Sequence, residues 1–284
     1  MATFTNQAQL VYNDTVINSN IAVGEITEAL TVAKSSLTGT YTPGNDITYV
    51  ISLINTGSSA ITGITLTDDL GAYDYNGTTL YPLTYNEGSA AAFLNGIQQP
   101  APTVTATATS LVISGISVPA GGNMIIIYEA TPNSYAPVQA DGSITNTVTA
   151  TSPDITAPVS ADTTVTVASA PELSVIKSVE PVPVSENGTL TYTITVQNAG
   201  NEEVAATDNA VIRDTLDPAI TGLTATLNGT LLVEGIGYTY DEATGEFATI
   251  AGVLSVPAAT YVQNPDGTWT VTPGVTTLVI TGTV

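Results

Sequence analysis

In this 284-residue sequence a lysine and an asparagine stand at positions where their side chains could form an amide bond with each other, beside an aspartate. Residues of one parity on a β-strand share a face. In the segment LTVAK, Lys34 continues the apolar parity of Leu30 and Val32. Asp68 in ITLTDDL and Asn146 in ITNTVTAT also fall on the apolar parity of their segments. All three polar side chains are therefore predicted to point into the interior.

A buried charge is unfavourable without a partner, so these three groups should meet. Burial lowers the pKa of a lysine and raises that of an aspartate. A neutral Lys34 amine could then attack the Asn146 carboxamide while a protonated Asp68 polarises it and shuttles the proton, releasing ammonia. The alternative is a cluster held by hydrogen bonds alone, or an asparagine that only satisfies a loop backbone. Both interpretations stay open.

The same residue types occur a second time, but the asparagine of this second set stands at the other end of the chain. The segment LSVIK carries Lys177, and VIRDTL carries Asp214 on the parity of its apolar residues. FTNQAQLVYND near the N-terminus resembles ITNTVTATSPD and places Asn6 where the latter has Asn146. We therefore expect Asn6 to complete the second set from a neighbouring subunit.

The chain is predicted to be all-β, because it alternates apolar and polar residues, is interrupted by Gly, Pro and Asn-Gly, and has no sustained helical periodicity. Two long stretches correspond: LTVAK with LSVIK, ITYVISLINTG with LTYTITVQNAG, and AFLNG with ATLNG. AGGNMIIIYEAT aligns with PGVTTLVITGTV, which sets Tyr128 against Thr281. We expect two tandem β-sandwiches at 29–170 and 171–284, preceded by an N-terminal donor hairpin at 1–28.

The second stretch stops before any counterpart of the hairpin 144–168, while a spare copy of that hairpin occupies about residues 3–26. A sheet that lacks a strand exposes unpaired backbone groups and invites another chain to add one. The hairpin of one molecule could complete the second sandwich of the next, and such head-to-tail contacts give open filaments. Self-completion is disfavoured, since residues 24–29 span only about 20 Å. The predicted donor-strand residues are Phe4, Asn6, Ala8, Leu10 and Tyr12.

Composition excludes several classes of function. Three Lys and Arg against 25 Asp and Glu give a formal net charge of −22, which disfavours nucleic acid and anionic membranes as partners. Without His or Cys the chain cannot build a Ser-His-Asp triad, a Cys nucleophile with a His base, a disulfide or a usual zinc site, and no cofactor is indicated. A weak calcium site at Asp68, Asp69 and Asp74 lacks EF-hand spacing. The sequence as written is expected to carry neither a signal peptide nor a membrane anchor.

The motifs L-x-V-x-K, T-Y-x-I-x-V-x-N-x-G, D-x-L and T-N-x-V/A together resemble a conserved-repeat domain of unknown function found in bacterial and archaeal surface proteins. The resemblance covers about 30–168 and 172–284 and implies immunoglobulin-like sandwiches with a structural, extracellular role. The Lys/Asp/Asn pattern is similar to that of self-cross-linked sandwich domains in Gram-positive pili, which implies an isopeptide bond.

We therefore expect a structural subunit of an extracellular filament or appendage, on a cell or spore surface, whose main partner is a second copy of itself. The first alternative is an adhesin or a stalk module of a surface layer. The second is an enzyme with a glycosidase-like pair of carboxylates. No motif supports the enzyme, so the only chemistry expected is autocatalytic isopeptide formation.

Overall fold

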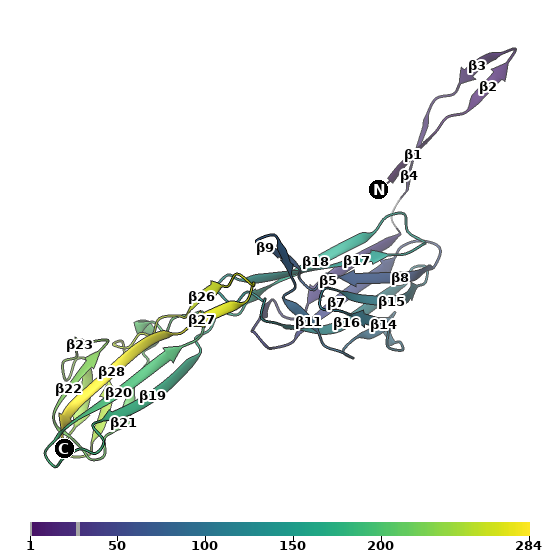
Figure 1. The fold of residues 1–284 in the computed structure, drawn as a ribbon. Coiled ribbons are helices and arrows are strands. Elements are labelled where there is room, and N and C mark those ends of the chain that lie inside the picture. The colour runs from purple at the N-terminus through teal and green to yellow at the C-terminus, as the bar shows by residue number, and fades with distance from the viewer. Residues whose placement is uncertain (1, 27–28) are drawn as a thin grey trace. The chain divides into compact units, whose positions relative to one another are not determined.

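The computed structural model describes residues 2–26 and 29–284, so the predicted segments 1–28 and 24–29 lie partly outside the described residues. Its described elements are β-strands apart from one turn of 3-10 helix at Ala206–Asp208, which confirms the all-β class (Figure 1). In the described part of the chain no helix has the length and apolar character of a membrane span.

The chain divides into two compact units. Unit 1 comprises Met1–Ala136 and Ser143–Thr166, and unit 2 comprises Pro137–Gly142 and Val167–Val284. Each unit contains antiparallel sheets with its own apolar interior.

The first sheet of unit 1 has the strand order β13-β12-β16-β7-β5, with β11 also paired to β16. Along β7 every second residue, from Ile47 to Asn55, is buried, and the residues between them are half-exposed or exposed. This pattern is expected for a sheet with one face on the core. The strands are β5 (Leu30–Ser36), β7 (Ile47–Asn55), β11 (Leu83–Tyr85), β12 (Ala91–Leu94), β13 (Ile97–Gln98) and β16 (Asn123–Pro132).

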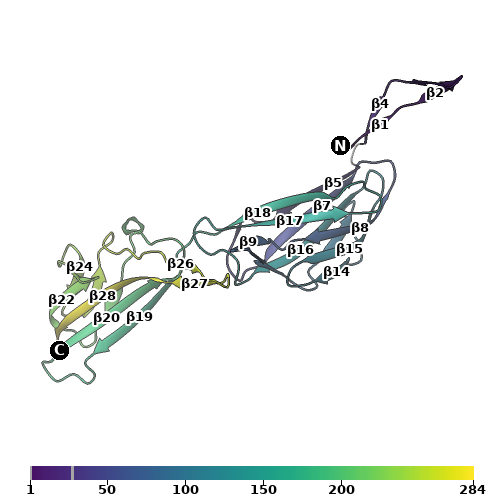
Figure 2. The same cartoon turned by 45° about the horizontal axis from the view of Figure 1, so that its top comes forward.

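The second sheet of unit 1 has the order β14-β15-β8-β17-β18-β6 (Figure 2). Strands β17 and β18 form a long hairpin, here called the closing hairpin, and β17 pairs with β8 so that Val148 lies opposite Asp68. The strands are β6 (Thr40–Tyr41), β8 (Ile61–Asp68), β14 (Thr103–Ala106), β15 (Leu111–Val118), β17 (Ser143–Thr151) and β18 (Val159–Val167). A separate small hairpin joins β9 (Tyr73–Tyr75) and β10 (Thr78–Leu80).

Unit 2 repeats five of the six strands of this first sheet, in the order β19-β20-β28-β22-β23, without a described counterpart of β11. Among the described residues its second sheet contains β21, β25 and β24 in that order, and β26 pairs with β27 apart from both. The strands are β19 (Leu173–Glu180), β20 (Thr189–Asn198), β21 (Arg213–Thr215), β22 (Thr221–Leu227), β23 (Thr230–Leu231), β24 (Tyr238–Asp241), β25 (Glu246–Thr249), β26 (Thr260–Gln263), β27 (Trp269–Thr272) and β28 (Gly274–Thr283).

The two first sheets share a tight Asn-Gly turn. Asn95 and Gly96 join β12 to β13, and Asn228 and Gly229 join β22 to β23, all with positive φ. Asn and Gly adopt this left-handed conformation more readily than other residues, which is why a two-residue hairpin turn selects them.

Strand pairing corrects one detail of the sequence alignment. Tyr128 of β16 lies opposite Tyr49 of β7, whereas in unit 2 it is Ile280 of β28 that lies opposite Tyr192 of β20. Matching the two sheets by their partners therefore sets Tyr128 against Ile280, one residue before the expected Thr281. The register of hydrogen bonding, and not the loop that precedes the strand, fixes this equivalence.

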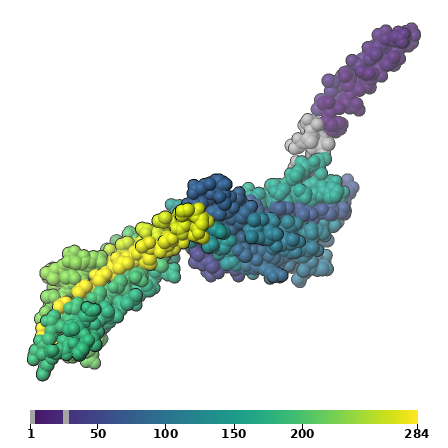
Figure 3. Space-filling model, in the orientation of Figure 1, coloured from purple at the N-terminus to yellow at the C-terminus, as the bar shows by residue number. Residues whose placement is uncertain are grey.

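The N-terminal hairpin, residues 2–26, is a two-stranded ribbon (Figure 1). Its atoms are the purple ones in the space-filling view (Figure 3). Strand β1 (Ala2–Asn6) pairs with β4 (Ala22–Ile26), and β2 (Gln9–Tyr12) pairs with β3 (Thr15–Asn18). Asn13 and Asp14 form its turn with positive φ at both positions. From position 4 to 23 the side chains are exposed, large apolar ones included. A lone two-stranded ribbon of this kind has little stability in water, so burial of its apolar side chains against a partner would stabilise it.

Candidate functional site

Three polar side chains meet in the interior of unit 1. Lys34 comes from β5 of the first sheet, and Asp68 and Asn146 come from β8 and β17 of the second. All three are buried. Burial alternates along β5 and β17 and along β8 from Ile64 to Asp68, so each polar residue replaces an apolar one on the core-facing side.

Asp68 is the centre of this cluster. Its Oδ2 accepts a hydrogen bond from Lys34 Nζ at 2.6 Å and a second from the Tyr128 hydroxyl at 2.6 Å. Its Oδ1 accepts from the backbone N–H of Leu70 at 3.0 Å. The carboxylate is thus held by three donors, as a buried charge requires.

Asn146 reaches the cluster through Tyr128. Its Nδ2 donates to the Tyr128 hydroxyl oxygen at 3.0 Å, and no direct hydrogen bond joins it to Asp68. Its Oδ1 is buried without a hydrogen-bond partner, as is the hydroxyl of Tyr49. Burial, followed by the charge of Asp68, raises the pKa of Tyr49, and the nearby Asn146 amide acts in the opposite direction, although no hydrogen bond of ordinary geometry joins the amide to that hydroxyl. An unsatisfied buried carbonyl is unfavourable and marks this amide as the unusual member of the cluster.

Burial dominates the electrostatics of the cluster. It lowers the pKa of Lys34 below the ordinary lysine value, although the neighbouring Asp68 acts in the opposite direction. Burial, followed by the charge of Asp68, raises the pKa of Tyr128 well above its usual range, so this hydroxyl keeps its proton. Lys34 Nζ also lies 5.0 Å from the ring centroid of Tyr49, which stacks on Tyr128. The site can therefore hold a lysine that gives up a proton more readily than one in water.

Tyr128 is the residue that the sequence analysis missed. It falls on the apolar parity of β16, where an aromatic side chain is expected in any sandwich core. The sequence did contain one signal: a buried tyrosine O–H usually requires a hydrogen-bond partner, so a tyrosine on the core-facing side indicates a polar group nearby.

Unit 2 holds a similar pair in a more open setting. Lys177 Nζ lies 2.6 Å from Asp214 Oδ2 and 4.6 Å from the ring centroid of Tyr192. The Lys177 side chain is 40% exposed, whereas that of Lys34 is 0% exposed. Ile280 takes the place that corresponds to Tyr128, so the described residues of unit 2 supply no bridging hydroxyl at that position.

The surroundings of this pair are also open. Leu173 and Val175 of β19 are 51% and 63% exposed, whereas the matching Leu30 and Val32 of β5 are 2% and 8% exposed. Strand β21, which carries Asp214, pairs with β25 on one side, and in the described part of the chain no strand pairs with its other side. In unit 1 strand β17 of the closing hairpin pairs with β8, which corresponds to β21, and it also contacts β5, which corresponds to β19. We call the corresponding region of unit 2, bounded by β19 and β21, the open seam.

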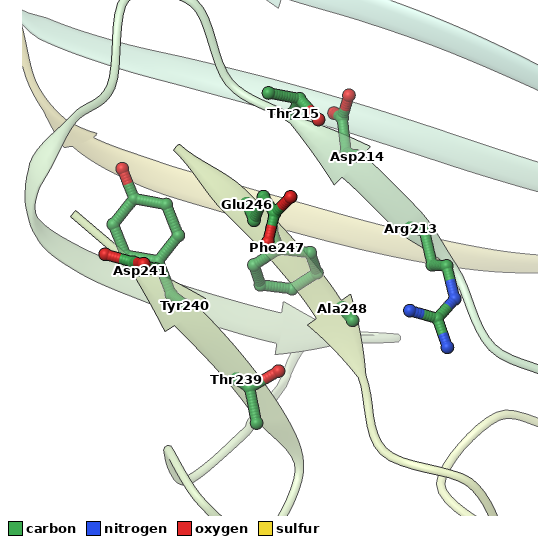
Figure 4. Close-up of a pocket in the computed structure, with 9 residues that line it drawn as sticks. All are labelled: Arg213, Asp214, Thr215, Thr239, Tyr240, Asp241, Glu246, Phe247 and Ala248. Carbon is green, nitrogen blue, oxygen red and sulfur yellow. The ribbon is translucent and has the colours of Figure 1, made fainter. Parts of the chain in front are cut away.

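The second sheet of unit 2 is hollowed beside this seam (Figure 4). The hollow is lined by residues of β21, β24 and β25, with Arg213 and Asp214 contributed by β21. Its lining combines three carboxylates, those of Asp214, Asp241 and Glu246, with the Arg213 guanidinium and aromatic side chains.

Asn6, the predicted partner of the Lys177–Asp214 pair, belongs to unit 1, whereas the pair lies in unit 2. The predicted donor residues Phe4, Asn6, Ala8, Leu10 and Tyr12 are all exposed. The pairing of β1 with β4 parallels that of the closing hairpin, since Asn6 lies opposite Ala22 as Asn146 lies opposite Thr163, whereas β2 and β3 pair one residue out of that register. The ring of Phe4 covers Gly24, the position that matches Val165 in the closing hairpin.

The carboxylates of the weak calcium candidate have other partners. Asp68 binds Lys34, Asp69 Oδ1 accepts from the backbone N–H of Thr147, and Asp74 accepts from that of Gly77. Among the described residues no group of three or more His, Cys, Asp or Glu side chains could hold a metal ion.

No protein-family model matches the chain, and no curated protein matches it in sequence. Among solved structures it is similar to the N-terminal domain of the Streptococcus gordonii adhesin Sgo0707, at 15% identity and a TM-score of 0.37, over 54% of this chain and 35% of that one. It is similar to the pilus backbone RrgB of Streptococcus pneumoniae, at 12% identity and 0.35, over 86% and 55%. It is also similar to BcpA, the major pilin subunit of Bacillus cereus, at 12% identity and 0.38, over 96% and 73%. The chain thus spans about a third and about half the length of the first two.

Proposed function

We propose that this chain is a structural subunit of an extracellular filament or appendage, on a cell or spore surface, and that it polymerises head to tail by donor-strand complementation. One observation carries the proposal: unit 2 leaves open the place that the closing hairpin fills in unit 1. The same chain also presents a hairpin of matching pattern with its apolar side chains exposed. Open sheet edges and exposed apolar faces are the usual setting for strand addition.

The register of the joint follows from unit 1. Because Val148 lies opposite Asp68 in the complete sandwich, Ala8 of the incoming hairpin should lie opposite Asp214. Leu10 would then lie opposite Ile212, and Asn6 would enter beside the Lys177–Asp214 pair. Leu173 and Val175 on β19 would be covered by the inner face of the hairpin. The contact joins two different surfaces, so it propagates from subunit to subunit.

Covalent bonds would strengthen this assembly. In unit 1 the Lys34 amine and the Asn146 amide share one buried cluster around Asp68, which suits a spontaneous isopeptide bond. In unit 2 the corresponding bond would join Lys177 to Asn6 of the incoming hairpin, with Asp214 as the proton shuttle. A filament with both bonds would be one continuous covalent chain.

Deleting residues 1–26 tests the proposed function. We expect the full chain to form fibres visible by electron microscopy and the deletion variant to remain monomeric, with an unstable unit 2. Ladders that survive boiling in denaturant would show the inter-subunit bond, and fibres that dissolve to monomers would show strand addition alone. If the deletion leaves the oligomeric state unchanged, the filament proposal is wrong and the adhesin or surface-layer stalk module becomes the better account.

A further inference from the structure

We propose that Tyr128 is a catalytic residue of the Lys34–Asn146 reaction: its hydroxyl carries the proton from Asp68 to the nitrogen that leaves Asn146. This inference rests on the isopeptide bond of the proposed function and assigns a residue that the Lys/Asp/Asn pattern does not contain. Its foundation is the order of contacts in the cluster, in which Tyr128 stands between the acid and the amide.

The geometry gives Asp68 no direct route to the leaving group. Lys34 Nζ and the Tyr128 hydroxyl both donate to Asp68 Oδ2 at 2.6 Å, while Asn146 Nδ2 donates to the Tyr128 oxygen at 3.0 Å and makes no hydrogen bond to Asp68. A chain of hydrogen bonds therefore links the amine, the carboxylate, the phenol and the amide nitrogen. In the unreacted cluster the phenol donates to Asp68 and accepts from Nδ2, so both of these bonds reverse once Asp68 carries the proton and Nδ2 holds a free electron pair. Both distances at the phenol lie within the reach of a proton transfer.

The reaction balances along this chain. Lys34 Nζ passes a proton to Asp68 Oδ2 and, as a free amine, forms a bond to Asn146 Cγ, whose oxygen takes the electron pair. Asp68 then returns its proton to the Tyr128 oxygen as the phenol gives its own proton to Nδ2, and the Cγ–Nδ2 bond breaks. As the carbonyl re-forms, Nζ passes a second proton to the Asp68 carboxylate, which hands it through the Tyr128 hydroxyl to the departing ammonia. Of the three Nζ hydrogens one therefore stays on the new amide and two leave with Nδ2, which departs as ammonium, and Asp68 is again a carboxylate. No charge is created and no other reactant is required.

Tyr128 suits a relay because it stays neutral throughout. Burial keeps its proton on the hydroxyl, so it accepts one proton only as it releases another. Asn146 Oδ1, which lacks a hydrogen-bond partner, is the atom on which negative charge develops during the attack. Unit 2 has Ile280 at the matching position, so we expect the Lys177–Asn6 bond between subunits to form more slowly than the bond within unit 1.

Tyr128→Phe is the direct test, and Tyr49→Phe is its matched control. The two rings stack on each other and both are fully buried, but the Tyr49 hydroxyl makes no hydrogen bond to Asp68. Intact mass and peptide mass spectrometry of the full-length protein report bond formation as the loss of one ammonia. Circular dichroism reports the fold of each variant.

We expect the wild type and Tyr49→Phe to lose one ammonia with Lys34 joined to Asn146, and folded Tyr128→Phe to react about 10²–10⁴-fold more slowly, the range that general acid–base catalysis supplies. Equal rates in Tyr128→Phe and the wild type, or an equal loss of rate in Tyr49→Phe, would overturn the assignment. A wild type that keeps its full mass would overturn it as well. That last result leaves donor-strand assembly intact wherever electron microscopy still shows fibres, so the two proposals fail separately. If Tyr128→Phe does not fold, Ile280→Tyr replaces it as the test: faster bonding of Lys177 to Asn6 supports the relay, and an unchanged rate contradicts it.

Discussion

Truncating Phe4 to alanine is expected to weaken the joint between subunits by about 2 kcal/mol. Phe4 is 54% exposed in the hairpin, and the matching Ile144 of unit 1 is 2% exposed, so docking would cover about half of the ring. Full burial of a phenylalanine contributes about 1.5–3 kcal/mol, so half contributes about 1 kcal/mol. The cavity left in the docked state adds a comparable amount, and the sum corresponds to about a thirtyfold weaker association.

The measurement requires a reversible joint. Lys177→Arg keeps the positive charge beside Asp214 but cannot form the amide, so both the parent and the Phe4→Ala variant should carry it. Sedimentation velocity over a range of protein concentrations then gives the concentration at which polymers appear. Thr5→Ala is the control, because Thr5 neighbours Phe4 and lies on the opposite face of the same strand. Polymerisation of the Phe4 variant at the concentration of its parent would refute the proposed docking of this face.

Two further predictions concern the register and the buried amine. The chain contains no cysteine, so introduced cysteine pairs can report the register. Gln9→Cys with Arg213→Cys should give a disulfide between subunits under oxidation, while Gln9→Cys with Thr215→Cys, two residues out of register, should not. The reverse pattern on a non-reducing gel would contradict the predicted pairing. In Asn146→Ala, Lys34 stays a free amine whose pKa in the folded state lies below 10.5, so the unfolded state binds more protons than the folded state. The free energy of unfolding should therefore rise with pH, up to about pH 10, where the tyrosines begin to ionise. Adding Lys34→Met should remove that slope in denaturant titrations, and an equal slope in both variants would show that Lys34 is not its source.

Much of the arrangement followed from the alternation of residues along strands. The two-residue period is strict in β5 and β17 and holds in β8 from Ile64 onward, and it alone places Lys34, Asp68 and Asn146 on the core side. The all-β class followed from the same pattern. The absence of a second closing hairpin among these residues was visible because the corresponding segments could be aligned over nearly their whole length.

The features that sequence did not predict depend on register between distant strands. Tyr128 and Asp68 are 60 positions apart, and only the pairing of β16 with β7 and the packing of the two sheets bring the hydroxyl to the carboxylate. The equivalence of Tyr128 with Ile280 was missed by one residue, because the loops before β16 and β28 differ in length and conceal the true register. Local patterns specify which face a side chain occupies but not which partner lies across the core.

The basic residues have a consequence for proteolysis. Trypsin cleaves after lysine and arginine, and the three such residues of this chain are Lys34, Lys177 and Arg213. Lys34 is buried in a complete sandwich, whereas Lys177 and Arg213 lie on the two strands that border the open seam. If the proposed joint forms, a neighbour would cover the cleavable bonds that a solitary subunit exposes, and digestion would remove unjoined molecules while sparing those already incorporated.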